Sequence, residues 1–468
     1  MKNPGLGINS GPASTPNIAR KHAERPCAHR LRWASFVMAF IVLALVSGAT
    51  RVQCGGDQTH PQSAQAQKPA ASPLLAQADE FLQEMSKLTG LPIKGPVNKK
   101  VASREEIREL LLHNLHTDYT PKEIHVQEAS LRAFGLVSKD FDLGSFLVSF
   151  YTEQAAGFYD PPTKTMYIAD WIPADMQRMV LAHELTHALQ DQNFNLEQYM
   201  KAAKKDSDAE AARQAVVEGY ATAAMFQSVL GETPLSSLPN FSAVLSPLIQ
   251  KSMSEFPVFS KAPFFFRLQA LFPYIQGAGF IEKGLIRGGW KSLNELFTSP
   301  PTSTKAIYQP DIYFNHTALP VIQLPRKTPL DSVRGLKFVD EDLMGELGFN
   351  ELLGQFLSEE KAAADCASWM GDRYLVYEDP SKQSYALVVR TRWASADAAL
   401  TFFRDYHELL TRKYPELSPE AGSTGDLFIG RTASGEVVML RVGDEVRWAE
   451  GVPANKVDAM QEWLGSLH

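Results

Sequence analysis

The chain has 468 residues, 44% hydrophobic and 21% charged, which is a globular composition and too long for one compact domain. The first 66 residues hold seven Lys or Arg and two Asp or Glu, so the remainder carries a net charge of −12, against −7 for the whole chain. This acidic balance argues against a nucleic-acid partner, and three cysteines, of which only Cys366 lies in the part expected to fold, exclude a disulfide framework.

The N-terminal 73 residues are expected to direct export. Residues 1–49 join a basic segment to the uncharged apolar run 33–49, WASFVMAFIVLALVSGA, and predict a signal peptide or signal anchor. At 17 residues the run is at the lower limit for spanning a bilayer, so cleavage and membrane anchoring both stay open. Residues 50–73, rich in Gln, Ala, Pro and Gly, predict a disordered linker. The folded part is then expected to be periplasmic, secreted or held at the membrane outside the cytoplasm.

Residues 74–358 are predicted to form a mainly helical domain with a small β-hairpin. The helices are expected at 76–88, 103–116 and 121–134. Ser103 and Glu106 have the spacing of a capping box, and the segment 157–168 changes to strand character around a turn. Peptidases hold substrates extended against an open sheet edge, so one hairpin strand could be that edge; a purely structural hairpin is the alternative.

The next segment, 179–194, contains His183, Glu184 and His187 in the pattern HExxH. Residues four apart on a helix lie on one face, so the two imidazoles can bind one metal ion while Glu184 lies beside it. Two His and one carboxylate are the ligands of a catalytic Zn²⁺ site, in which one position stays open for water. The pattern therefore predicts zinc bound by His183 and His187, with Glu184 as the general base.

A second long helix is predicted over 206–230. It carries Glu218 within the apolar run AVVEGYATAAMF. A buried carboxylate is costly unless it is paired or binds a metal, so Glu218 is predicted as the third zinc ligand. The alternative is that Glu218 reaches solvent or pairs with a cation, and then another helical carboxylate such as Glu210 competes for the ligand role.

HELTHA, followed by Asp191 and by a glutamate on a second helix, resembles the gluzincin metallopeptidases, the thermolysin-like class. The resemblance covers residues 150–235 and implies a zincin-like domain that hydrolyses peptide bonds. It also implies that Asp191, on the same face as His187, gives a hydrogen bond that supports a ligand. Where the family has an Asp four residues after its third ligand, this chain has Thr222.

Four further motifs together resemble a group of uncharacterised exported bacterial HExxH proteins: VVEGYAT, PPTSTKAIYQP, GELG and WMGDRY. Within the second motif the group reads STEQ and HP, where this chain has STKA at 303–306 and QP at 309–310. Asp372 and Arg373 of the last motif are expected to cap a helix and to pair with a charge.

Residues 236–297 are rich in aromatic side chains, which favours helix packing over an apolar specificity pocket or a membrane-facing patch. Three prolines, including Pro273, are expected to divide this stretch into short helices. Tyr308 and Tyr313 follow in a Pro-rich loop, where either could hydrogen-bond an oxyanion or simply pack.

Residues 359–468 are predicted to form a C-terminal antiparallel α+β domain, because strand patterns alternate with turns and two helices are expected at 395–413 and 455–467. The whole chain is therefore of the α+β class. The sequence predicts an exported zinc metallopeptidase acting on polypeptides or peptides. Two alternatives stay open: a non-catalytic zinc-containing protein that binds an envelope partner, and a zinc hydrolase acting on a non-peptide bond.

Overall fold

The computed structural model describes residue 1 and residues 77–238, 240–420 and 422–468. The expected signal segment, the apolar run 33–49 and the linker 50–73 lie outside the described residues. Within the described ranges, no helix has both the length and the apolar character that crossing a membrane requires.

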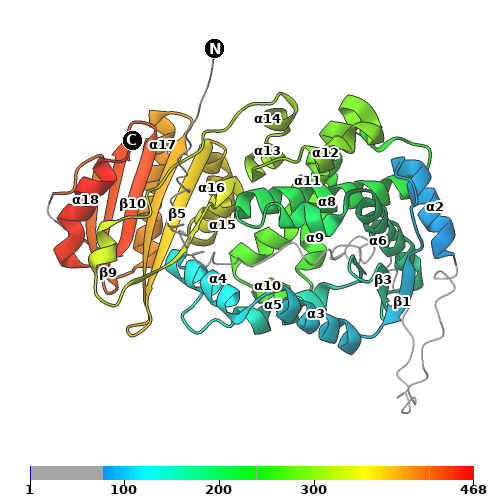
Figure 1. Ribbon diagram of the computed structural model, residues 1–468, viewed down its shortest axis with the longest axis horizontal. Coiled ribbons are helices and arrows are strands. Elements are labelled where there is room, and N and C mark those ends of the chain that lie inside the picture. The colour runs from blue at the N-terminus through cyan, green and yellow to red at the C-terminus, as the bar shows by residue number, and fades with distance from the viewer. Residues whose placement is uncertain (2–76, 239, 421) are drawn as a thin grey trace, which may run out of the picture.

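The chain forms a mainly helical part with a three-stranded sheet, followed by a seven-stranded antiparallel sheet with its own helices (Figure 1). The predicted α+β class is confirmed. The helical part contains α2 (Ala78–Thr89), β1 (Asn98–Ala102), α3 (Arg104–Asp118), α4 (Pro121–Phe134), α5 (Leu143–Gln154), β2 (Gly157–Asp160), β3 (Thr165–Ala169), α6 (Ala174–Phe194), α7 (Leu196–Lys201), α8 (Ser207–Leu230), α9 (Phe241–Met253), α10 (Pro257–Lys261), α11 (Phe264–Leu293), α12 (Glu295–Thr298), α13 (Thr304–Tyr308) and α14 (Pro310–Phe314). The rest contains β4 (Lys337–Asp342), α15 (Gly345–Phe356), α16 (Glu359–Cys366), β5 (Trp369–Asp379), β6 (Ser384–Trp393), α17 (Ala396–Lys413), β7 (Ser418–Pro419), β8 (Leu427–Thr432), β9 (Gly435–Val442), β10 (Glu445–Val452) and α18 (Val457–Gly465).

Two of the predicted helices, α3 and α4, begin at capping boxes. The Ser103 side chain accepts from the backbone N–H of Glu106, and the Glu106 carboxylate accepts from the backbone N–H of Ser103. Thr120 and Glu123 repeat the arrangement at α4, where Pro121 occupies the first helical position. Both boxes satisfy amide groups that a helix start leaves without partners.

The predicted hairpin is confirmed. β2 and β3 pair antiparallel, with Gly157 opposite Ile168, and β1 adds in parallel on the other side of β3. The strand order is β1-β3-β2, so β2 is an outer strand of this small sheet.

The expected break at Pro273 is wrong. α11 continues through Pro273, and the helix is interrupted by a kink at Gly289, where φ is 65°, before a last turn that ends at Leu293. A proline inside a helix removes one hydrogen bond and can be tolerated when packing holds the flanking turns. Phe272 and Tyr274 on either side of it are both buried.

The C-terminal sheet has the order β4-β5-β6-β10-β9-β8-β7, and all its pairings are antiparallel. Its first strand, β4, precedes the expected domain boundary at 359, so the sheet draws on residues from before that point. On one face the Trp393 and Phe402 rings stack at 4.2 Å, and Phe349 of α15 joins them. On the other face Met460 and Leu464 of α18 close a second apolar cluster.

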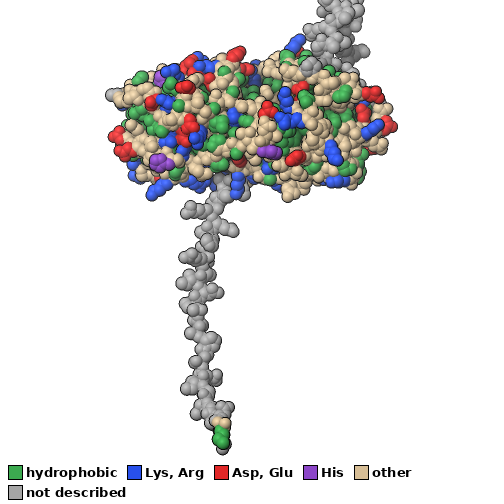
Figure 2. Space-filling view, turned by 90° about the horizontal axis from the view of Figure 1, so that it is seen from above, with side chains coloured by type: hydrophobic (Ala, Val, Ile, Leu, Met, Phe, Trp, Pro, Cys, Tyr) green, Lys and Arg blue, Asp and Glu red, His purple; other side chains and the backbone are tan. Residues whose placement is uncertain are grey.

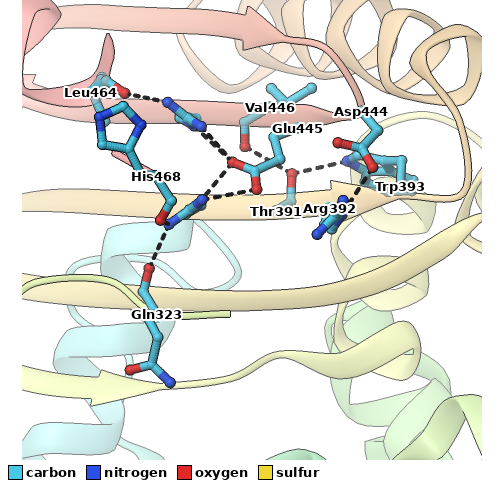
Figure 3. Close-up of polar contacts among 11 residues, drawn as sticks. Gln323, Thr391, Arg392, Trp393, Asp444, Glu445, Val446, Leu464 and His468 are labelled. Carbon is cyan, nitrogen blue, oxygen red and sulfur yellow. Dashed lines mark hydrogen bonds and ion pairs between the residues drawn. The ribbon is translucent and has the colours of Figure 1, made fainter. Parts of the chain in front are cut away.

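A buried ionic group fixes the central strands of this sheet. Glu445 on β10 accepts hydrogen bonds from Arg390 on β6 at 2.9 Å and from Arg447 at 2.9 Å (Figure 3). Arg390 also donates to the backbone oxygens of Gln323 and His468, and Arg447 donates to that of Leu464. The two guanidinium groups therefore tie the sheet to the segment before β4 and to the chain's last residues. Burial acts to raise the pKa of Glu445, but the two arginines outweigh it and hold the pKa below its ordinary value.

We expect Glu445→Gln to destabilise the fold by about 3–5 kcal/mol, because it leaves two buried guanidinium groups without their carboxylate. Urea unfolding followed by circular dichroism measures this. The matched control is Glu408→Gln, which breaks the exposed Arg412–Glu408 ion pair. It should lower the free energy of unfolding by no more than about 1 kcal/mol. Equal losses in the two variants would contradict a special role for the buried group.

Candidate metal centre

α6 and α8 bring the three predicted ligands together. The Nε2 atoms of His183 and His187 lie 2.9 Å apart, and Oε2 of Glu218 lies 3.2 Å from the first and 3.4 Å from the second. All three side chains are buried. With bonds of about 2.0–2.1 Å, two ligand atoms of a tetrahedral zinc ion lie about 3.3 Å apart. These three residues could therefore hold one metal ion, whereas Glu210 is not part of the group.

The hydrogen bonds around His187 fix which of its nitrogens faces the other ligands. The amide nitrogen of Gln190 donates to the backbone oxygen of Val217 at 3.1 Å, so the amide oxygen points to Nδ1 of His187, 2.8 Å away. That oxygen can only accept, so Nδ1 carries the proton and a neutral His187 presents a lone pair at Nε2. This lone pair faces the Glu218 carboxylate at 3.4 Å. Two acceptors this close repel each other unless a cation lies between them.

The protonation states also suit a metal. Burial lowers the pKa of His183 to about 4, although the hydrogen bond with Glu218 acts in the opposite direction. Burial acts to raise the pKa of Glu218, but the neighbouring imidazoles outweigh it and keep the pKa below its ordinary value. Near neutral pH His183 is then neutral and Glu218 ionised, which are the forms that bind a metal.

Glu184 follows His183 on α6 and is fully buried. The backbone of β2 passes directly beside it, because a Cβ placed on Gly157 would lie 3.5 Å from Cγ of Glu184 and only 2.7 Å from a methyl carbon of Val180. Only glycine lets the strand approach α6 this closely. The outer strand of the small sheet and the predicted base are therefore neighbours.

Asp191 lies away from the ligand atoms. Its carboxylate accepts from the Tyr159 hydroxyl at 2.9 Å, from Nζ of Lys164 at 2.6 Å and from the backbone N–H of Leu196 at 3.2 Å. It ties the end of α6 to the β2–β3 hairpin. The hydrogen bond to a ligand that was expected of Asp191 is not among its contacts. Gln190, which also lies on the face of His187, instead bonds Nδ1 of His187.

Close helix packing holds α8 in register. A Cβ on Gly219 would lie 2.3 Å from the backbone of Gly277 on α11, so the two glycines let the helices touch backbone to backbone. This contact is next to Glu218. α11 also places Tyr274 beside the centre, with its ring 6.2 Å from that of His183.

Tyr308 and Tyr313, expected in a loop, lie in the short helices α13 and α14 and contact other partners. The Tyr313 hydroxyl donates to the backbone oxygen of Ser299, and Tyr308 packs on Phe272. Of the aromatic stretch, Tyr274 is thus the ring that stacks near a ligand histidine.

The motifs beyond the two ligand helices meet at Asp208, in the first turn of α8. Asp208 accepts from the backbone N–H of Thr304 at 2.8 Å and from its hydroxyl. Gly345 has a φ of 71°, and a Cβ there would lie 1.9 Å from the Asp208 carboxylate. Asp372 accepts from the backbone N–H groups of Met344 and Gly345 at 2.9 and 3.0 Å, so its expected capping role is confirmed.

The altered loop is part of the same buried junction. Nζ of Lys305 lies 3.2 Å from Oε2 of Glu346, and the Gln309 amide donates to the same oxygen at 3.3 Å. Arg373 pairs with Glu341 at 3.2 Å, as expected. These residues join α8 to the C-terminal sheet and take no part in the group that could hold a metal.

One family model matches the chain, over residues 334–461, and it is described as a domain of unknown function, DUF8575. The match begins just before β4 and ends within α18, so it covers the C-terminal sheet and leaves the metal centre outside. No curated protein and no solved structure matches the chain.

We expect Gln190→Ala to weaken zinc binding about 10- to 100-fold, because it frees the His187 ring and its tautomer. Competition with a chromophoric chelator measures the affinity. Asp191→Asn is the neighbouring control. Its zinc affinity should stay within about 3-fold of the parental value, since removing an orienting group typically costs more than that. A larger loss of zinc affinity in Asp191→Asn than in Gln190→Ala would show that Asp191 supports the centre.

Glu218→Gln should lower zinc affinity more than about 100-fold, beyond the loss typical of an orienting residue, because the site loses its only charged ligand. His183→Ala and His187→Ala should each do the same. The stoichiometry, read by atomic absorption on the purified protein, should be one zinc per chain before mutation. Undiminished affinity in Glu218→Gln would remove this residue from the ligand set.

Proposed function

We propose that this protein is a zinc-dependent metallopeptidase that acts outside the cytoplasm. The observation that carries the proposal is the convergence of two imidazole nitrogens and one carboxylate oxygen within 3.4 Å, with one imidazole fixed in the metal-binding tautomer. Two His and one carboxylate leave an open coordination position, as catalytic zinc sites do. When bound, the zinc ion supplies Lewis acidity that activates a water and polarises a carbonyl.

Glu184 is the residue proposed to move the proton. It is adjacent to His183 in sequence and buried, so a carboxylate there sits beside the metal ligands in a dry environment. In the proposed reaction Glu184 accepts a proton from the attacking water and delivers it to the nitrogen of the leaving amine. His183, His187 and Glu218 hold the ion, and Gln190 orients His187.

A peptide substrate is favoured over other amides or esters by the position of β2. This outer strand passes beside Glu184 at Gly157, and an extended peptide can add to such a strand through backbone hydrogen bonds. The added strand would bring its own peptide bonds next to the proposed base. A substrate without a peptide backbone would make no use of this edge.

The proposed partner is therefore a polypeptide rather than a nucleic acid. Among the described residues on the face seen in Figure 2, basic and acidic side chains are interspersed. A phosphate backbone would need a continuous basic track, and the chain carries a net charge of −7. The proposal that it acts outside the cytoplasm rests on the basic and apolar N-terminal segments of the sequence.

Glu184→Gln should keep zinc affinity and lower the rate of peptide cleavage about 10²- to 10⁴-fold, because the amide cannot take the water proton. Mass spectrometry of a peptide library, with zinc content measured in parallel, tests both parts. Cleavage at the parental rate would rule out Glu184 as the base.

Two other results would replace the proposal. If no peptide is cleaved but esters or cell-wall fragments are, the protein is a zinc hydrolase of a different substrate class. If zinc is retained without turnover of any of these substrates, a non-catalytic binding protein is the better description.

A further inference from the structure

A second cavity lies between the metal centre and the C-terminal sheet. It encloses about 80 Å³, and its described walls come from α4, α8, α11, α15 and the residue Tyr374 of β5. Most of the wall is apolar, including Leu131, Phe134 and Leu347. A space of this size accommodates several water molecules or a short chain of ligand atoms.

Two buried carboxyl groups, Glu210 and Glu351, line this cavity, and one oxygen of Glu351 has no hydrogen-bond partner among the described residues. Glu351 on α15 is 1% exposed, and the oxygen in question is Oε1. None of the described residues in the wall is Lys, Arg or His. Burial raises the pKa of Glu351 well above its ordinary value. An isolated buried carboxylate is disfavoured, so burial favours the neutral acid, and a cation in the cavity would favour the carboxylate.

The cavity lies within reach of the metal centre along two helices. On α8, Gln214 lines the cavity four residues before Glu218, which is about 6 Å along the helix. On α11, Gln269 lines it five residues before Tyr274, whose ring lies beside His183. Adjacent residues of an extended peptide are about 3.3 Å apart. A long side chain of a residue close to the scissile bond has the length to span this distance.

We propose that the cavity is a specificity pocket that takes a basic side chain, Lys or Arg, of a residue next to the cleaved bond, with Glu351 as its counter-ion. This inference rests on the proposed peptidase activity and names its substrate class. A long aliphatic stem suits the apolar wall, and only a cationic tip matches the unpartnered carboxylate. An aromatic or branched apolar side chain would fill the wall but would leave Glu351 without a partner.

The first test compares two fluorogenic peptides that differ at one position, lysine against norleucine, which has nearly the same length and no charge. The zinc-loaded full chain should prefer lysine in kcat/KM by about 10- to 100-fold, as expected for a hydrogen bond to a charged group in a buried site. In Glu351→Gln the preference should fall to within about 3-fold, mainly through KM. The control Glu360→Gln, at an exposed position of α16, should keep the parental preference.

The second test does not need catalysis. n-Pentylammonium should raise the melting temperature of the parental protein by at least about 2 °C, while n-pentanol should not, and Glu351→Gln should abolish the difference. Glu351→Gln should fold, because glutamine has the shape of a neutral glutamic acid. Amine binding without any peptide cleavage would support a cation-binding site at Glu351 and contradict the proposed peptidase activity. Cleavage without a lysine preference, together with no amine binding, would overturn the specificity pocket.

Discussion

The structure depends on a carboxylate and two imidazole lone pairs that the fold brings within 3.4 Å of one another in a dry interior. Gln190 fixes the orientation of the His187 ring. Its amide nitrogen donates to the backbone oxygen of Val217, so its amide oxygen accepts from Nδ1 of His187. Without a cation, the lone pair at Nε2 of His187 faces the Glu218 carboxylate at 3.4 Å, which is unfavourable, whereas Nε2 of His183 can hydrogen-bond that carboxylate. With a divalent ion the same contacts become favourable, so metal binding and the close crossing of α6 and α8 support each other.

α8 is the element that links this centre to the rest of the molecule. Its first turn carries Asp208, which is locked to Thr304 and packed against Gly345, and these contacts fasten it to the helix and strands of the C-terminal part. Its middle carries Glu218, and the glycine contact with α11 at Gly219 fixes its position and rotation. A ligand helix held at two points cannot slide by a residue without breaking one of them. The part of the chain that matches a domain of unknown function therefore also supports the helix that carries Glu218.

The sequence allowed a large part of this to be predicted, wherever local chemistry decides the outcome. Capping boxes, the hairpin, the HExxH spacing and a charged Glu218 in an apolar run are signals that need no knowledge of distant residues. The role of Gln190 was missed, and Asp191 was named in its place. Both residues lie on the face of His187, but Asp191 is held by Tyr159 and Lys164, which are 32 and 27 residues earlier. β4 escaped prediction for a similar reason, because four of its six residues are Lys, Asp or Glu, and only its pairing with β5 makes it a strand.

The buried acids of this protein also connect the two sites. Several of them form ion pairs with Lys or Arg side chains of the same chain, which balance their charge. The pairs are Lys305–Glu346, Arg390–Glu445 and Lys413–Glu450. Glu218 and Glu351 differ, because the first faces imidazole lone pairs and the second faces a cavity without a described basic residue in its wall. Among the described residues, no Lys or Arg side chain pairs with either acid. A metal ion suits the first position, where three ligand atoms converge, and an extended cationic side chain suits the second, where the surrounding wall is apolar.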